Sequence, residues 1–353
     1  MKGVNFPVFK TKTEGVTQKF NLNDPEDRKK YFAAKAGTDI EKLKKYLETK
    51  TFVGFLMGKK NSGKGTYSKL FMEAVGKEHV GHVSIGDIVR DIHKSLSSED
   101  DKKTLLEFME KNFRGFHSVE ELEDLILGRG TSSLMSSELI VALIKYEISR
   151  RPKKAIFIDG FPRAMDQIGY SLFLKELIGY RDDPDFMVFI DVPERVIDER
   201  IKSRVICPKC NTPRSLKLAL TKEVGYDETQ KSFYLICDDC HERMVPKEGD
   251  ELGIEPIRSR LEVDDQISKQ LLELSGIPKL YLRNSVPIDQ KDIVDDYELT
   301  PMYEYVYNNE TKKVDAIEKP WVVKDDNGVD SYSLMPSAVA LGLISQIAKT
   351  LNL

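Results

Sequence analysis

The sequence predicts an α/β protein built on a parallel β-sheet that is flanked by helices. Three short apolar runs carry this prediction, at residues 51–57, 154–159 and 186–192. Near-continuous apolar runs of this length are typical of parallel strands covered on both faces. Helical stretches separate the runs, so crossover helices should cover the sheet. Ligands should then gather at the carboxyl ends of the strands.

The first apolar run leads directly into a glycine-rich loop, residues 58–66, and then into the helical stretch 67–75. The glycines let the backbone turn tightly and point its N–H groups inward, while a lysine and the positive end of the helix attract an anion. We therefore expect a phosphate-binding loop in a P-loop NTPase-type sheet. The residues expected to hold phosphate are Gly58, Ser62, Gly63, Lys64, Gly65 and Thr66.

The remaining elements follow from periodicity and from start and stop signals. A helix over residues 39–50 should begin at a capping box formed by Thr38 and Glu41. Residues 82–90 should form a strand that runs into a helix. Further helices are expected at 99–127, 136–150 and 257–274, a hairpin or small sheet between 297 and 333, and a final helix over 336–351.

The composition is that of an ordinary soluble protein. With 353 residues, 32% charged, 40% hydrophobic and a net charge of −4, the chain has room for one large domain with insertions or for two domains. No partner of nucleic acid or membrane type is expected, because there is no basic excess and no apolar run of about 20 residues. The amino terminus lacks a signal-like stretch, so we expect a cytoplasmic protein, with a monomer as the default state.

Four cysteines form two close pairs, Cys207 with Cys210 and Cys237 with Cys240. This spacing favours metal ligation in a reducing compartment over a disulfide framework. Four thiolates can close a tetrahedral site, so the expected metal is a structural Zn²⁺ that holds a small module together. Four free thiols are the competing interpretation, and His241 beside Cys240 could replace one ligand.

Residues 51 to about 290 resemble the adenylate kinases, because several motifs occur in the order seen in that family. The first 50 and the last 60 or so residues have no counterpart. The motifs are the glycine-rich loop, Ser84-Ile-Gly-Asp-Ile-Val-Arg90, Asp159-Gly-Phe-Pro-Arg163 with Gln167, Asp191-Val-Pro193, Arg200-x-x-x-Arg204 and Ile257-Arg-Ser-Arg-Leu-Glu262.

The resemblance implies a division of the chain into a kinase core with two mobile insertions. The core would comprise residues 51–83, 151–204 and 254–295, with an enlarged nucleoside monophosphate-binding helical arm at 84–150 and a zinc-bearing lid at 205–253. A helical extension, 1–50, would precede the core, and a β-hairpin and helix extension, 296–353, would follow it.

The resemblance also implies Mg²⁺-dependent phosphoryl transfer from ATP to AMP, giving two ADP. The loop and Arg200 would bind ATP, while Ser84, Ile85, Arg90, Gly160, Arg163 and Gln167 would bind the acceptor. Asp87 and Asp159 would lie near the magnesium ion. The catalytic set would be Lys64, Arg90, Arg163, Arg200, Arg204 and Arg260.

Several positions depart from the family pattern. Lys60 and Asn61 replace the proline and glycine that are usual in the loop of the family. Ile85 replaces a threonine that is common near the acceptor base, and Lys247 occupies the region where the family usually has a lid arginine. A UMP/CMP or other monophosphate kinase therefore stays open as an alternative. A second alternative is a nucleotide-sensing scaffold with incidental kinase activity, whose terminal extensions bind an unknown protein partner.

Overall fold

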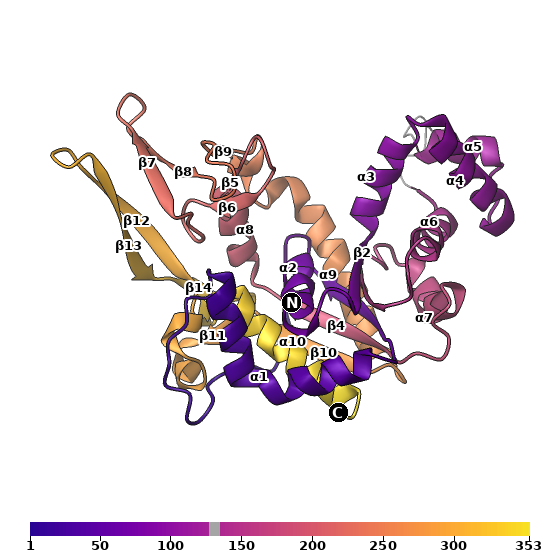
Figure 1. Ribbon diagram of the computed structural model, residues 1–353, viewed down its shortest axis with the longest axis horizontal. Coiled ribbons are helices and arrows are strands. Elements are labelled where there is room, and N and C mark those ends of the chain that lie inside the picture. The colour runs from indigo at the N-terminus through magenta and orange to yellow at the C-terminus, as the bar shows by residue number, and fades with distance from the viewer. Residues whose placement is uncertain (127–134) are drawn as a thin grey trace.

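A five-stranded parallel sheet forms the centre of the computed structural model, which describes residues 1–126 and 135–353 (Figure 1). All four neighbouring strand pairs are parallel, so the predicted fold class is confirmed. The strand order is β10 (Lys279–Arg283), β4 (Asp185–Asp191), β1 (Val53–Gly58), β3 (Ala155–Asp159) and β2 (Val80–Ser84).

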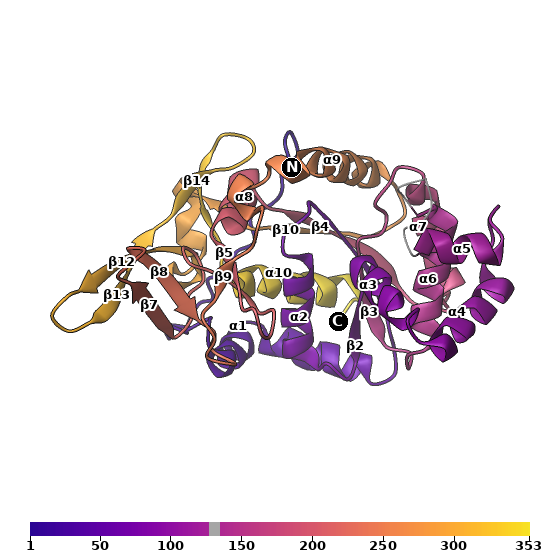
Figure 2. The ribbon, with the colours of Figure 1, turned by 90° about the horizontal axis from the view of Figure 1, so that it is seen from above.

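Helices cover both faces of this sheet (Figure 2). Along β1, Phe55 and Met57 join one apolar cluster while Leu56 joins the other, as the alternation of strand side chains requires. The first cluster includes residues of α6 (Ser137–Ser149), α7 (Gln167–Leu177) and α9 (Arg258–Glu273). The second includes residues of α1 (Pro25–Leu47), α2 (Lys64–Val75), α8 (Glu194–Lys202) and α10 (Pro336–Thr350).

Helix α1 begins earlier than the sequence predicts. The Asp24 side chain caps it by accepting hydrogen bonds from two backbone N–H groups, and Pro25 occupies the first helical position. The predicted helix is the second half of this element, which kinks at Ala36, where φ is −140° and ψ is 21°. The capping box at Thr38 was therefore wrong as a helix start, because the helix already runs through that position.

The helical arm consists of α3 (Ile85–Ser95), α4 (Glu99–Asn112), α5 (Val119–Ile126) and α6. The charged helical stretches predicted over 99–127 are thus two helices, and Leu127 lies outside the described residues. Leu105, Met109 and Leu122 bury their side chains in the arm, so the exposed charge faces solvent. The predicted limits 84–150 include residues 127–134, which the structure does not describe.

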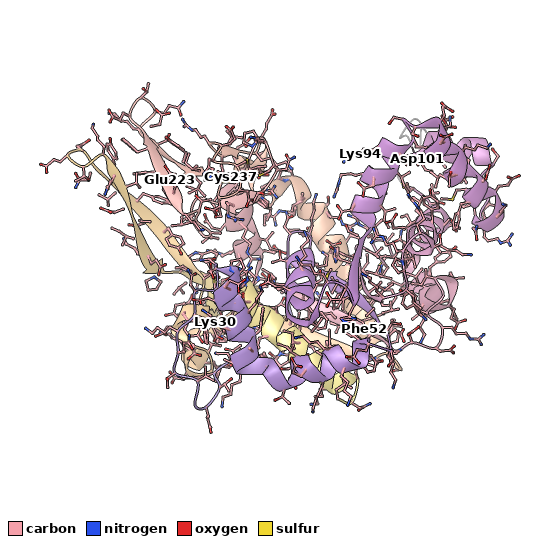
Figure 3. All side chains as sticks on the ribbon, in the orientation of Figure 1. Lys30, Phe52, Lys94, Asp101, Glu223 and Cys237 are labelled. Atoms are coloured by element: carbon pink, nitrogen blue, oxygen red, sulfur yellow. The ribbon has the colours of Figure 1, made fainter. Side chains whose placement is uncertain are left out.

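A small β-rich module follows α8. It holds a three-stranded sheet of β6 (Pro213–Ser215), β5 (Arg204–Ile206) and β9 (Val245–Pro246), and a hairpin of β7 (Glu223–Asp227) and β8 (Ser232–Ile236). Figure 3 shows Cys237 in this module and Phe52 in the central body. Two short 3₁₀ turns, η1 (Asp250–Leu252) and η2 (Glu255–Ile257), lead back to α9.

Two further β-structures lie between β10 and the last helix, where one hairpin or small sheet was predicted over 297–333. One is a sheet of β11 (Ser285–Pro287), β15 (Asp330–Ser333) and β14 (Val322–Lys324), and the other is the hairpin β12 (Pro301–Asn308) with β13 (Lys313–Pro320). The 3₁₀ turns η3 (Ile288–Ile293) and η4 (Asp296–Glu298) connect them.

Helix α10 contacts α1, α2 and β10, so it covers the sheet although it is last in the chain. The residues between β11 and α10, 288–335, are called the inserted segment below. The domain limits themselves remain predictions. No helix within residues 1–126 and 135–353 is long and apolar enough to cross a membrane.

The β12–β13 hairpin lies along the β7–β8 hairpin (Figure 1). The rings of Tyr307 and Tyr226 stack with centroids 4.3 Å apart, and Phe233 packs against Tyr305 at 5.1 Å. The Tyr307 hydroxyl donates to Glu228 at 2.7 Å. These contacts join the inserted segment to the cysteine-bearing module.

Candidate functional site

The glycine-rich loop connects β1 to α2, and its backbone takes positive φ angles at Gly58, Asn61 and Gly63. Gly58 has a φ of 153°, and a side-chain carbon there would come within 2.8 Å of the Ile190 carbonyl oxygen. Asn61 has a φ of 65°, in the left-handed region that asparagine tolerates better than most residues. The departure from glycine at Asn61 therefore keeps the loop geometry.

Lys64 begins α2 and turns back over the loop, where its Nζ donates to the Gly58 carbonyl at 2.9 Å. Its ammonium lies 3.8 Å from Asp159 at the end of β3. Burial lowers the pKa of Lys64, and Asp159 and Asp264 only partly oppose that effect. A bound phosphate would supply the negative charge that holds the ammonium in its charged form.

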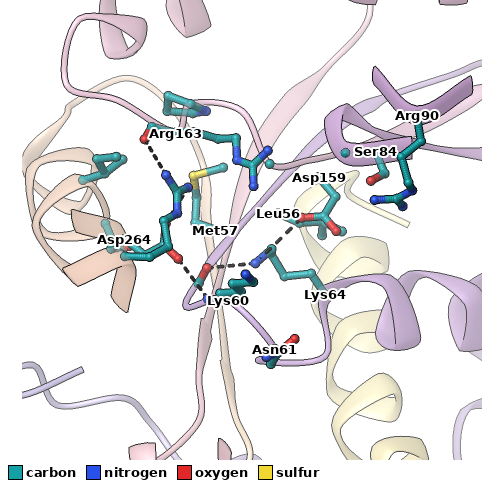
Figure 4. Close-up of a pocket in the computed structure, with 17 residues that line it drawn as sticks. Leu56, Met57, Lys60, Asn61, Lys64, Ser84, Arg90, Asp159, Arg163 and Asp264 are labelled. Carbon is teal, nitrogen blue, oxygen red and sulfur yellow. Dashed lines mark hydrogen bonds and ion pairs between the residues drawn. The ribbon is translucent and has the colours of Figure 1, made fainter. Parts of the chain in front are cut away.

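A first cavity, of about 200 Å³, opens beside Lys64 at the carboxyl ends of the strands (Figure 4). Arg163 and Arg260 approach each other in it, with Arg260 Nη1 donating to the Arg163 carbonyl at 3.1 Å. Burial and the charge of Arg260 lower the pKa of Arg163. Two guanidinium groups in one cavity suit an anion that each can grip with two hydrogen bonds. The site residues predicted from the sequence that line this cavity are Gly58, Lys64, Ser84, Arg90, Asp159, Gly160, Arg163 and Arg260.

Three predicted residues near this cavity do not line it. Ile85 is buried beneath Gly160. Asp87 is exposed on α3 and forms an ion pair with Arg90, one turn further along the helix. Gln167 is buried, and its Oε1 accepts a hydrogen bond from the Arg163 backbone at 2.7 Å. The amide of Gln167 is thus held at the edge of the arginine cluster.

A second cavity, of about 620 Å³, lies on the other side of the loop. It extends from the loop past Tyr67 and Arg200 to Thr300, Met335 and Pro336. The predicted residues that line it are Ser62, Gly63, Lys64, Gly65, Thr66, Asp159, Arg200 and Arg204.

The two arginines of this cavity have different partners. Arg204 forms a bidentate pair with Asp250, with both N–O distances at 2.6 Å. Arg200 donates to the side-chain oxygen of the fully buried Asn284 at 3.3 Å. Arg204 is thus held by the cysteine-bearing module, and Arg200 by the central body. Lys247, the predicted replacement for a lid arginine, lines neither cavity.

Lys64, Asn61 and Asp159 line both cavities. The smaller cavity gathers Arg90, Arg163 and Arg260, whereas the larger gathers the loop amides and the other two arginines. Cationic side chains thus line both cavities, and the cavities meet at Lys64. This arrangement could hold two anionic ligands side by side and allow direct transfer of a phosphoryl group between them.

His82 lies behind this junction. Its Nε2 is 3.9 Å from Asp159, and its Nδ1 is 2.9 Å from the Ser68 hydroxyl. Burial lowers the pKa of His82. The neutral ring therefore supports Asp159 through its position and adds no charge near pH 7.

Several site residues were not predicted from the sequence. Asp264 pairs with Arg260 at 2.8 Å and accepts a hydrogen bond from the Lys60 backbone at 2.9 Å. The spacing of four residues on one helix could have indicated the first contact. Lys59 forms ion pairs with Asp326 at 2.6 Å and Glu194 at 2.9 Å, so its ammonium points away from both cavities. No local signal indicates that partner.

The four cysteines converge, with their sulfur atoms within 4.8 Å of one another. The Thr212 hydroxyl and backbone N–H lower the pKa of Cys210 to about 6, whereas the neighbouring Cys207 and burial raise the pKa of Cys240 to about 12. The sulfur atoms of Cys207 and Cys240 are 3.2 Å apart, those of Cys210 and Cys237 are 3.5 Å apart, and those of Cys210 and Cys240 are 3.7 Å apart. Tetrahedral zinc with bonds of about 2.3 Å would place them about 3.8 Å apart. The donor set therefore fits a closed four-thiolate metal site.

The fold and the double cavity define a nucleotide-binding P-loop protein with a transferase site. Its relatives narrow the class. An adenylate kinase of Thermotoga neapolitana is 30% identical over 222 residues, which cover 62% of this chain and 83% of the relative. An adenylate kinase of Thermotoga maritima is 31% identical over 59% of this chain and 77% of the relative. An adenylate kinase of Clostridium acetobutylicum is 28% identical over 68% of this chain and 91% of the relative.

The chain belongs to the adenylate kinase family and is a phosphotransferase of the nucleoside monophosphate kinase class. No family model matches the sequence.

Proposed function

We propose that this chain catalyses reversible, Mg²⁺-dependent phosphoryl transfer from ATP to AMP, giving two ADP. One observation carries the proposal: two arginine-lined cavities share Lys64 and Asp159 at their junction. The larger cavity would hold ATP and the smaller would hold the phosphate of AMP. The matched adenylate kinases support this choice of substrates.

The site residues would act by position and charge. Lys64 and the loop amides would hold the transferring phosphate, Arg90 and Arg163 the acceptor phosphate, and Arg200, Arg204 and Arg260 the charge that spreads during transfer. Gln167 would present its amide to the acceptor base. Its Nε2 forms no hydrogen bond among the described residues.

Two metal ions belong to this proposal. Mg²⁺ would enter with ATP near Asp159, with Asp87 reaching it after α3 moves. It would neutralise charge on the phosphates. Zn²⁺ would fill the four-cysteine site and hold the module folded while it closes over ATP. This module has only a small apolar cluster of its own, formed around Val205, Leu235 and Met244.

The decisive experiment measures ADP formed from ATP with a panel of monophosphates, on protein of known zinc content. We expect AMP to be the best acceptor, and Lys64→Ala to lower turnover by about 10²–10³-fold, as expected for loss of a charge that stabilises the transition state. Lys42→Ala is the matched control, because Lys42 is exposed on α1. A purified, folded protein that forms no ADP with any acceptor would refute the proposal.

A further inference from the structure

A third cavity, of about 450 Å³, shares no lining residue with the smaller transferase cavity and borders the larger one. It is enclosed by the segment 20–23 before α1 and by residues of the inserted segment. Phe20, Tyr297, Tyr303, Trp321 and Tyr332 contribute aromatic rings to its wall. The cavity is larger than the one proposed to hold the acceptor phosphate, and the transferase reaction gives it no role.

Three of these rings have faces that no other ring covers. Phe20 packs edge-on against Tyr297 with centroids 6.0 Å apart. Trp321, Tyr303 and Tyr332 make no ring–ring contact in the described part of the chain. Trp321 is only 8% exposed, and the Lys291 ammonium lies over the Tyr332 ring, 5.9 Å from its centroid. The half-buried Tyr303 ring is therefore the surface beside this cavity on which a planar heterocycle can stack.

The charged groups of the wall cancel one another. Lys291 forms an ion pair with Asp296 at 2.8 Å. The ammonium of Lys319 pairs with Glu304 at 2.5 Å, and Glu318 accepts a hydrogen bond from the Tyr303 hydroxyl at 3.1 Å. No cation of this wall is left without a carboxylate nearby, so the cavity offers little to a phosphate group.

Neutral polar groups complete the wall. Asn21 and Asn23 line the cavity and are exposed, and a side-chain amide can pair with the edge of a base. The Thr300 side chain is 8% exposed, and its hydroxyl has no hydrogen-bond partner among residues 1–126 and 135–353. A buried hydroxyl without a partner is costly unless a ligand uses it.

We infer that this cavity binds an uncharged purine nucleoside, with the base stacked on Tyr303 and in contact with the exposed edge of Trp321. Aromatic faces, amide groups and balanced charge favour a neutral heterocycle over a nucleotide. Asn23, Thr300 and Met335 also line the larger transferase cavity, so the two sites share a wall. The binding itself does not depend on the proposed reaction.

Trp321 is the only tryptophan of the 353-residue chain, which makes its fluorescence a direct reporter for this cavity. Adenosine is titrated into the full-length zinc-loaded protein, with saturating ATP and AMP and without added Mg²⁺. We expect a saturable change in tryptophan emission. Tyr303→Ala should weaken adenosine binding about tenfold, as loss of one stacking partner predicts. Tyr307→Ala removes a tyrosine of the same strand outside the cavity and should leave the affinity unchanged.

Three results would overturn the inference. The first is an emission that adenosine does not change in a protein that is folded and binds ATP. The second is a change that disappears when ATP and AMP are present, since adenosine would then occupy the transferase site. Binding to Tyr303→Ala with unchanged affinity, measured by calorimetry, would equally exclude stacking in this cavity. Kinase turnover measured on the same sample tests the proposed reaction separately.

Discussion

Asn284 should position Arg200 for the donor nucleotide. Its side chain is fully buried and contacts three groups. It accepts hydrogen bonds from Arg200 at 3.3 Å and from the Ser333 hydroxyl at 2.9 Å, and donates to the Leu334 carbonyl at 2.9 Å. Asn284→Ala removes all three. Arg200 and the end of the inserted segment at Ser333 and Leu334 would then no longer be held by the same side chain.

The expected effects follow from these contacts. Ser333 and Leu334 would each keep a buried polar group without this partner, at about 1–3 kcal/mol each, so the free energy of unfolding should fall by about 2–6 kcal/mol. Arg200 would lose one long hydrogen bond to its charged group. A loss of about 1 kcal/mol in donor binding corresponds to a KM for ATP raised about fivefold. The KM for AMP should not change, because Arg200 does not line the smaller cavity.

Steady-state kinetics with each substrate varied, at a temperature where circular dichroism shows every variant folded, test this prediction. Ser333→Ala is the matched control, since it lowers stability without touching Arg200. Asn284→Asp keeps an acceptor for Arg200 and should restore the KM for ATP. An unchanged KM for ATP in folded Asn284→Ala, or an equal rise in Ser333→Ala, would contradict the role assigned to Asn284.

Two further predictions concern the cysteine-bearing module. Removal of zinc by a chelator, or Cys210→Ser, should unfold this module and abolish ATP-dependent turnover while the central sheet stays folded; metal analysis that finds no zinc on active protein would contradict this. Tyr307→Ala removes a stacked ring pair worth about 0.5–1.5 kcal/mol, so amide hydrogen exchange in β7 and β8 should become about twofold to tenfold faster. Lys313→Ala, on the exposed side of β13, is the control, and equal exchange in both variants would show that the hairpins do not support each other.

The elements that the sequence predicted well depend on neighbours in the chain. The strand and loop around Lys64 are one contiguous pattern of apolar residues and glycines, and the cysteine pairs are each four residues long. Even the unusual Asn61 could have been read as a left-handed position, since the matching residue in the family is glycine. In such patterns the interactions between residues close in the chain determine the structure, so it can be predicted from the sequence alone.

Contacts between distant segments could not be predicted in this way. Lys35 and Glu298 form an ion pair at 2.8 Å, both fully buried, although 263 residues separate them. Nothing distinguishes Lys35 from the other lysines of α1 in the sequence. The third cavity was missed for the same reason, because Phe20 and Trp321 meet only after the sheet and α10 are in place.

The two segments outside the family resemblance act together on one half of the site. Glu298 of the inserted segment accepts hydrogen bonds from Tyr31 at 2.6 Å and from Lys35, so α1 fixes this segment through charge buried from water. Breaking such a buried pair costs about 3–5 kcal/mol. Asn284 then joins the same segment to Arg200. No residue of 1–50 or 288–335 lines the smaller cavity, whereas Asn23, Thr300 and Met335 line the larger one. Changes in α1 or in the inserted segment should therefore alter donor binding and leave acceptor binding intact.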